Sequence, residues 1–212
     1  MRLTVRDLVF SHPGSPPVLR GVNLEATAGE SIAIVGPSGS GKTTLLALIG
    51  GLLHPKSGAI GLTKNGLGDV EPVRREASWV LQTVNILADR TVADNVALGA
   101  CADGVSRRQA LTLAAAALRT VGLDGYGPRA VRTLSGGEVQ RVVIARAVIG
   151  RRKVLLADEP TGQLDHDTST TVTDALLSAA RDRILVVVTH DAEVAARCSR
   201  TYHLQSGVTE PQ

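Results

Sequence analysis

Short apolar runs separated by turn residues fill the two ends of the chain. Residues 31–35, 153–157 and 184–189 are almost continuously apolar. Runs of this length are typical of strands that are covered on both faces, as in a parallel sheet flanked by helices. Residues 3–10 and 18–24 are less uniform and favour two further strands. Additional short strands are predicted at 59–62, 77–81 and 201–205, the last as an edge strand.

The middle third of the chain changes to helical signals. Thr91-x-x-Asp94 favours a helix start, and Ser106-x-x-Gln109 and Ser135-x-x-Glu138 are capping boxes. In the helix that follows Ser106, one face is predicted to be buried, made by Leu111, Ala114, Ala115 and Leu118. Further helices are expected at about 166–180 and 191–198. The whole chain, 1–212, therefore predicts a single α/β domain, with a core at about 1–82 and 150–212 and a helical subdomain at about 83–149.

Composition narrows the possible partners. The net charge is only +3, from 23 basic and 20 acidic residues, and aromatic residues make up 2% of the chain. This balance predicts no nucleic-acid partner, because bases would find few rings to stack on. Cys101 and Cys198 are far apart, which favours a reduced, cytosolic chain. No apolar run approaches the length of about 18 residues that crosses a bilayer, so any membrane role requires a partner.

A glycine-rich loop between the apolar runs 31–35 and 45–49 carries the first candidate chemistry. It matches the phosphate-loop pattern G-x-x-x-x-G-K-[ST]. Its residues are Gly36, Pro37, Ser38, Gly39, Ser40, Gly41, Lys42, Thr43 and Thr44. The glycines let backbone amides approach a phosphate, Lys42 adds a full charge, and the Thr43 hydroxyl is a ligand for Mg²⁺. The plainer alternative is a glycine-rich turn with a solvated lysine. The loop predicts a nucleoside triphosphate but does not say what its hydrolysis drives.

Two carboxylates follow the apolar strand at 153–157. In phosphate-loop proteins the Asp at this point, here Asp158, holds Mg²⁺. The next residue, Glu159, then faces the terminal phosphate, where it can accept a proton from an attacking water. A pair of acidic residues at a strand end is the alternative.

The segment Leu134–Glu138 contains two glycines directly after a helix cap. Gly136 and Gly137 each cost a helix about 1 kcal/mol, so their presence requires a reason. Bare amides at a helix start bind anions. Because this turn has the Ser135 hydroxyl but no lysine, we expect it to act as the second half of a site whose first half is a phosphate loop.

These motifs, in this order and spacing, resemble the ATP-binding subunit of an ABC (ATP-binding cassette) transporter. The resemblance spans about residues 3 to 208. It implies a RecA-like, mostly parallel sheet, an N-terminal antiparallel part and a helical subdomain. It also implies that two copies meet head to tail around two Mg·ATP, so that Ser135, Gly136 and Gly137 close on the ATP held by the partner. The implied activity is ATP hydrolysis that drives a separate membrane permease, at the inner face of the cell membrane.

Four more residues take their roles from this resemblance. Gln82 resembles the glutamine that approaches Mg²⁺ and the attacking water, and Asp165 the acidic residue at the dimer seam. His190 resembles the histidine that contacts the γ-phosphate. Many family members have a tyrosine near the chain start that stacks on adenine. The aligned residue here is His12, so the chain departs from the family pattern at the base-stacking position.

Residues 158–165 and 91–96 are similar to those of the lipoprotein-release, macrolide-efflux and antimicrobial-peptide-resistance cassettes, although Gln163 replaces an Asn. Two alternatives stay open at this point. One is a soluble ABC ATPase, for example of iron–sulfur assembly. The other is a mechanical switch that regulates a membrane or cell-wall partner.

Overall fold

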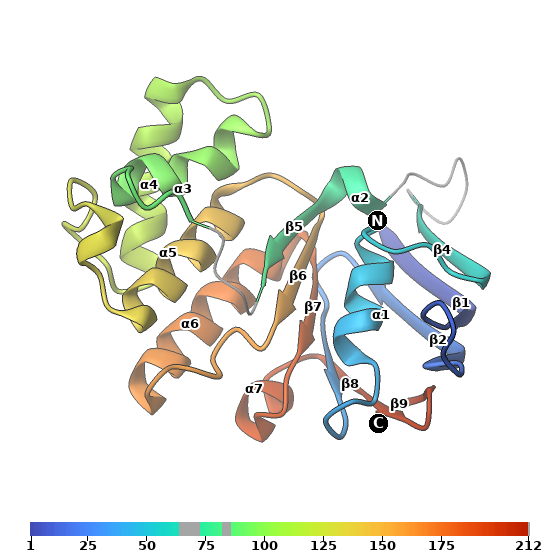
Figure 1. The fold of residues 1–212 in the computed structure, drawn as a ribbon. Helices are drawn as coiled ribbons and strands as arrows, with labels where there is room; N and C mark the ends of the chain where they lie inside the picture. Colours follow the sequence, from blue (N-terminus) through green and yellow to red (C-terminus); the bar gives the residue numbers. More distant parts are fainter. Residues whose placement is uncertain (64–72, 82–85, 212) are drawn as a thin grey trace. The chain divides into compact units, whose positions relative to one another are not determined.

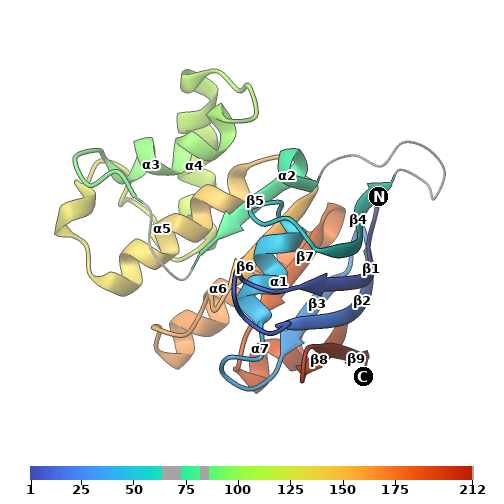
Figure 2. The same cartoon turned by 45° about the vertical axis from the view of Figure 1, so that its right-hand side comes forward.

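A computed structural model describes residues 1–63, 73–81 and 86–211 of the chain. By its internal contacts the chain divides into two compact units. The first consists of Met1–Ala77, Lys153–Glu159 and Ala180–Gln212, and the second of Ser78–Arg152 and Pro160–Ala179. Figure 1 labels most helices and strands of the two units, and β3 is labelled in Figure 2. Each unit is described by itself below.

An antiparallel sheet forms one part of the first unit. It contains β1 (Arg2–Phe10), β2 (Leu19–Thr27) and β4 (Ser57–Thr63) in the order β2-β1-β4. Leu3, Val5 and Leu8 of β1 are all buried, although Leu8 is three residues after Val5. A bulge explains this spacing, since the register shifts between Val5 and Leu8 and Asp7 lies at a φ of 48°. Figure 2 shows the three strands side by side.

A second sheet of the first unit is mostly parallel. It contains β3 (Ser31–Val35), β6 (Val154–Asp158), β7 (Ile184–Val188), β8 (Arg200–Gln205) and β9 (Val208–Pro211). Its order within this unit is β6-β7-β3-β8-β9, and only β9 runs antiparallel to its neighbour. All residues of β6 and β7 are buried, as expected for strands covered on both faces. Helix α1 (Lys42–Ile49) packs on β6 and β7, and α7 (Ala192–Ala196) packs on β3.

One strand was missed and one was misplaced by the sequence prediction. The strand predicted as an edge, 201–205, is β8, which lies between β3 and β9. The edge is β9, joined to β8 by a turn at Ser206 and Gly207 with φ angles of 52° and 84°. Two left-handed residues in a row are typical of a tight hairpin turn, so the Ser-Gly pair was the available signal.

The second unit is mainly helical. It contains α3 (Val92–Cys101), α4 (Arg107–Thr120), α5 (Gly136–Ile149) and α6 (His166–Ala179). Helix α3 packs on both α4 and α5, and a Cβ at Gly99 would collide with the carbonyl oxygen of Arg146, which explains the glycine. The second unit also contains the 3₁₀ turn Val131–Thr133 and most of β5 (Ala77–Val80). Two short elements, α2 (Val73–Glu76) and the 3₁₀ turn Ala180–Asp182, belong to the first unit.

The predicted buried face of the helix after Ser106 was wrong in two positions. Ala114 and Leu118 are buried as predicted, but Ala115 is exposed and Leu111 only half-buried. Ala110 and Ala117 complete the buried face instead. The run of four alanines at 114–117 offers no contrast between faces, so the pattern could not place the boundary. Among the described residues, no helix has both the length and the apolar character required to cross a bilayer.

Candidate nucleotide-binding site

The phosphate loop joins β3 to α1 in the first unit, as predicted. Two of its glycines are required by close neighbours. A Cβ at Gly36 would collide with the carbonyl oxygen of Leu204 on β8, and a Cβ at Gly41, where φ is 100°, would lie 2.8 Å from Cγ1 of Val18. The loop is therefore pressed between β8 and the start of β2. Val18 and Leu204 were not singled out from the sequence, because neither belongs to a motif.

The start of α1 leaves its first amides available. Gly41 is the N-cap and makes no side-chain cap bond. The next residue, Lys42, lies across the loop and its Nζ donates to the carbonyl oxygens of Gly36 and Pro37, each at 2.9 Å. Uncapped amides and an adjacent ammonium form an electropositive concavity, which is the chemistry that binds phosphate.

Asp158, at the end of β6, is only 4% exposed. Its burial raises the pKa of the carboxyl, and the neighbouring Glu159 charge adds to this, while a hydrogen bond with Thr43 acts in the opposite direction. The Oδ1 atom of Asp158 is buried and has no partner within the described residues. A buried, unpaired carboxylate oxygen beside a threonine hydroxyl fits a hard cation such as Mg²⁺.

The described residues contain no cluster of three or more His, Cys, Asp or Glu side chains that could hold a metal by itself. A Mg²⁺ ion at this position would therefore be held by Thr43 and Asp158 together with phosphate oxygens. That division of ligands is usual for Mg²⁺ at nucleotide sites. When bound, the ion supplies charge that neutralises the phosphates.

Glu159 and His190 meet at the same edge of the sheet. The register pairs Asp158 with Val188, so the residues that follow β6 and β7 emerge side by side. Oε2 of Glu159 lies 2.9 Å from Nδ1 of His190, and this hydrogen bond is the largest cause that raises the pKa of His190. Glu159 has a φ of 46°, held by its amide donating to the carbonyl of Val188 at 2.9 Å. Backbone strain of this kind at a non-glycine residue is common at functional sites.

The second predicted half-site lies in the helical unit. Ser135 caps α5 as predicted: its hydroxyl accepts from the Glu138 amide at 3.3 Å, and the Glu138 carboxylate accepts from the Ser135 amide at 2.7 Å. A Cβ at Gly136 would meet nothing within 4 Å, whereas one at Gly137 would lie 3.3 Å from Cδ2 of Leu164. Within the part of the chain that the structure describes, no neighbour requires Gly136 to be glycine, which favours a ligand from outside.

The remaining predicted residues have different environments. Asp165 accepts from the amide and hydroxyl of Thr168 at 3.0 and 2.7 Å, so it caps α6. The exposed His12 ring packs edge-on against Phe10, with centroids 5.0 Å apart. Gln82 lies outside the described residues. The roles given to these residues, and to those above, stay predictions.

Comparison with known proteins decides the family. Residues 19–162 match the model of the family described as ABC transporter. The chain belongs to the ABC transporter family. It is 43% identical over 207 residues to the lipoprotein-releasing system ATP-binding protein LolD of Nitratidesulfovibrio vulgaris, covering 93% of this chain and 89% of that protein. It is also 42% identical over 202 residues to the macrolide export ATP-binding/permease protein MacB of Rhodopirellula baltica, of which it spans 30%.

A solved structure agrees with this. The chain superposes with a TM-score of 0.83 and 31% identity on the ATP-binding cassette MJ0796, a dimeric post-hydrolysis state bound to ADP and Pi, covering 98% of this chain and 96% of that one. The predicted family, group and fold are confirmed. The protein is an ABC transporter ATPase that uses ATP and Mg²⁺, and its partners are a second ATPase subunit and a membrane permease.

Proposed function

We propose that two copies of this chain enclose two Mg·ATP at composite sites. In each site one subunit supplies its phosphate loop, Asp158, Glu159 and His190, and the other supplies Ser135–Gly137. The observation that carries the proposal is the set of contacts in the first unit. The orphaned Asp158 oxygen lies beside Thr43, and the Glu159 carboxylate is held by His190.

The proposed roles follow from this chemistry. Lys42 and the loop amides stabilise charge on the transferred phosphoryl group, and Glu159 orients and deprotonates the attacking water. His190 holds Glu159 and reaches the γ-phosphate. The family resemblance gives Gln82, which lies outside the described residues, a role toward the ion and the attacking water. Further proposed contacts are to adenine through His12 and across the dimer seam through Asp165.

Dimerisation tests the composite site directly. Glu159→Gln is expected to retain Mg·ATP binding and to accumulate as a dimer, measured by light scattering, because the carboxylate that drives hydrolysis is gone. Adding Ser135→Arg to this variant should prevent the dimer yet spare nucleotide binding by the single subunit. A Glu159→Gln, Ser135→Arg chain that still dimerises with ATP would contradict the shared site.

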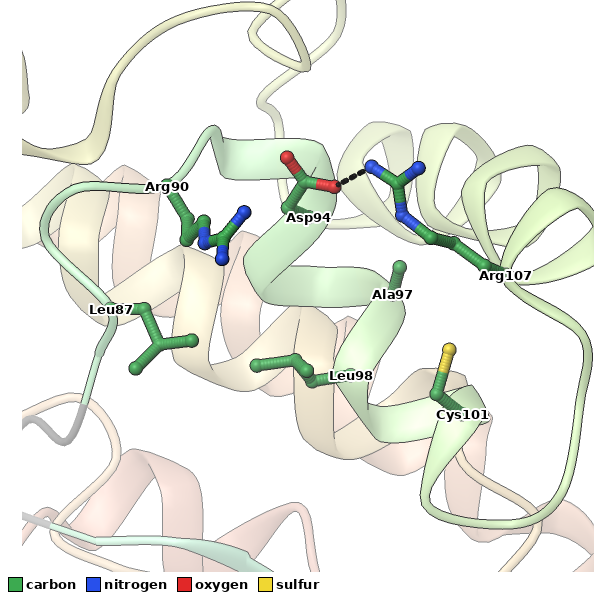
Figure 3. A pocket seen from close by; sticks show the side chains of 7 residues that line it. All are labelled: Leu87, Arg90, Asp94, Ala97, Leu98, Cys101 and Arg107. Carbon is green, nitrogen blue, oxygen red and sulfur yellow. Dashed lines mark hydrogen bonds and ion pairs between the residues drawn. The ribbon is translucent and has the colours of Figure 1, made fainter.

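We also propose where the permease docks. A pocket of about 420 Å³ lies on α3 and the segments beside it, lined by Leu87, Arg90, Asp94, Ala97, Leu98, Cys101 and Arg107 (Figure 3). Leu87 and Leu98 are 48% and 40% exposed and line the same pocket, so they present apolar surface together. Arg90 adds positive charge to the pocket lining, whereas Arg107 is already paired with Asp94 at 2.8 Å. An apolar permease segment with an acidic residue fits this pocket.

This docking site has its own control. Leu98→Asp is expected to abolish co-purification with the permease and to leave Mg·ATP binding unchanged. Leu113→Asp, a 39% exposed leucine on α4 that does not line the pocket, should co-purify normally. Equal co-purification of the two variants would place the permease elsewhere.

The proposed cellular position follows from the partner: the chain lies at the inner face of the cell membrane, held there by the permease. The proposed domain organisation remains one cassette over 1–212, with a core at about 1–82 and 150–212 and a helical subdomain at about 83–149.

A further inference from the structure

Arg141 connects the start of α5 with the end of α4. It lies one turn after Glu138, and its Nη1 donates to the carbonyl oxygens of Val121 and Gly122 at 3.3 and 3.2 Å. Gly122 has a φ of 68°, and a Cβ there would lie 3.3 Å from the same Nη1. The two carbonyls that directly follow α4 thus accept from a guanidinium of a neighbouring helix.

The charge of Arg141 also acts on two carboxylates of the proposed interface. Hydrogen bonds from Ser135 are the largest cause that lowers the pKa of Glu138, and hydrogen bonds from Thr168 are the largest cause that lowers the pKa of Asp165. The positive charge of Arg141 is a smaller cause that lowers both pKa values. Glu138 is three residues before Arg141 on α5, a spacing that brings side chains together on a helix. The Nε atom of Arg141 is buried without a partner among the described residues. The hydrogen bonds given above for this side chain are both made by Nη1.

A second contact joins the same two segments. Leu164, the residue that precedes Asp165, lies close over Gly137, since a Cβ added to this glycine would be 3.3 Å from Cδ2 of Leu164. The Ser135–Gly137 turn therefore lies close to the segment that leads into α6. Helices α5 and α6 are in contact as well.

We infer that Arg141 is a positioning residue: by joining α5 to the segment that ends α4, it holds the Ser135–Gly137 turn at the start of α5 in the arrangement that a second copy of the chain meets. The inference rests on the proposed function, because it assumes that this turn binds the partner's nucleotide. The physical reason is preorganisation: a turn fixed before binding loses less entropy when the dimer closes. Arg141 also offsets the negative charge of Glu138, which would otherwise weaken an anion site at the same helix start.

The test uses the full chain with Glu159→Gln as background and measures dimerisation in Mg·ATP. Arg141→Ala is expected to weaken dimerisation by about 10-fold, because a turn that is no longer fixed must be ordered when the dimer closes. Arg141→Lys should lie between, because lysine keeps the charge but loses the forked geometry. Mg·ATP binding by the single subunit should change less than about twofold. Arg108→Ala, an exposed arginine on α4, is the matched control and should behave like the parent.

Two results would overturn the inference. One is dimerisation of Arg141→Ala and Arg141→Lys at the parent's affinity. The other is a parallel loss of thermal stability and single-subunit ATP binding in Arg141→Lys, which would indicate general destabilisation. Ser135→Arg in the same background separates this failure from that of the proposed function. If Ser135→Arg blocks the dimer while the Arg141 variants do not, only the positioning role fails.

Discussion

Substitution of Gly41 tests why the phosphate loop has its shape. In Gly41→Ala the new methyl group meets two separate costs. The backbone lies at a φ of 100°, and left-handed conformations cost a non-glycine residue about 1–2 kcal/mol. The new Cβ would also lie 2.8 Å from Cγ1 of Val18 and 3.1 Å from Cδ2 of Leu19, and overpacking of this kind costs about 1–3 kcal/mol. The sum is roughly 3 kcal/mol.

A matched glycine separates the two terms. Gly39 has a φ of 77°, but a Cβ there would meet nothing within 4 Å. Gly39→Ala should therefore show only the conformational cost of about 1–2 kcal/mol. Urea unfolding, followed by circular dichroism, measures the free energy of unfolding of both variants. In thermal unfolding, a chain of this size should lose about 2–4 °C of melting temperature for each kcal/mol of lost stability.

A double variant completes the test. Val18→Ala removes Cγ1, so the Gly41→Ala, Val18→Ala chain should be more stable than the sum of the single changes predicts, by about 1–2 kcal/mol. If residues 18 and 41 show no such coupling, or if Gly39→Ala is as costly as Gly41→Ala, the close packing described for the loop is wrong.

Other parts of the structure give further predictions. Lys42→Ala should weaken Mg·ATP binding at least about 10-fold in calorimetry, because a charge on the phosphates is lost; unchanged affinity would argue against the phosphate-loop role. Asn95→Ala should destabilise the chain by about 2–3 kcal/mol in urea, since this fully buried amide bonds to backbone at Leu87 and Thr91. The Arg107 hydrogen bond is the main cause that lowers the pKa of Asp94. At pH values above the unfolded-state pKa of about 3.9, the free energy of unfolding of the native chain should therefore be larger than that of Asp94→Asn by about 0.2–1 kcal/mol. Because the folded pKa is the lower one, this advantage should vanish as the pH falls through it; a difference that grows in acid would contradict the sign.

Local patterns were the most reliable guide to the fold. The capping box at Ser135 and Glu138 was predictable, because its bonds join residues three apart. The meeting of Glu159 with His190 followed from parallel strands whose carboxyl ends share one edge. Contacts of residues that belong to no motif were not predictable. Val18 and Leu204 press on the loop glycines because of how β2 and β8 are placed, and neither residue carries a local signal.

The composite site is tested most directly by mixing two inactive variants. Lys42→Ala damages a phosphate loop and keeps the Ser135 turn, whereas Ser135→Arg does the opposite. Each variant alone should hydrolyse ATP at a small fraction of the native rate. In a mixed dimer one site combines the intact loop of one chain with the intact turn of the other. ATPase activity should therefore reappear on mixing and grow with total protein concentration; mixtures that stay as inactive as their components would contradict the shared site.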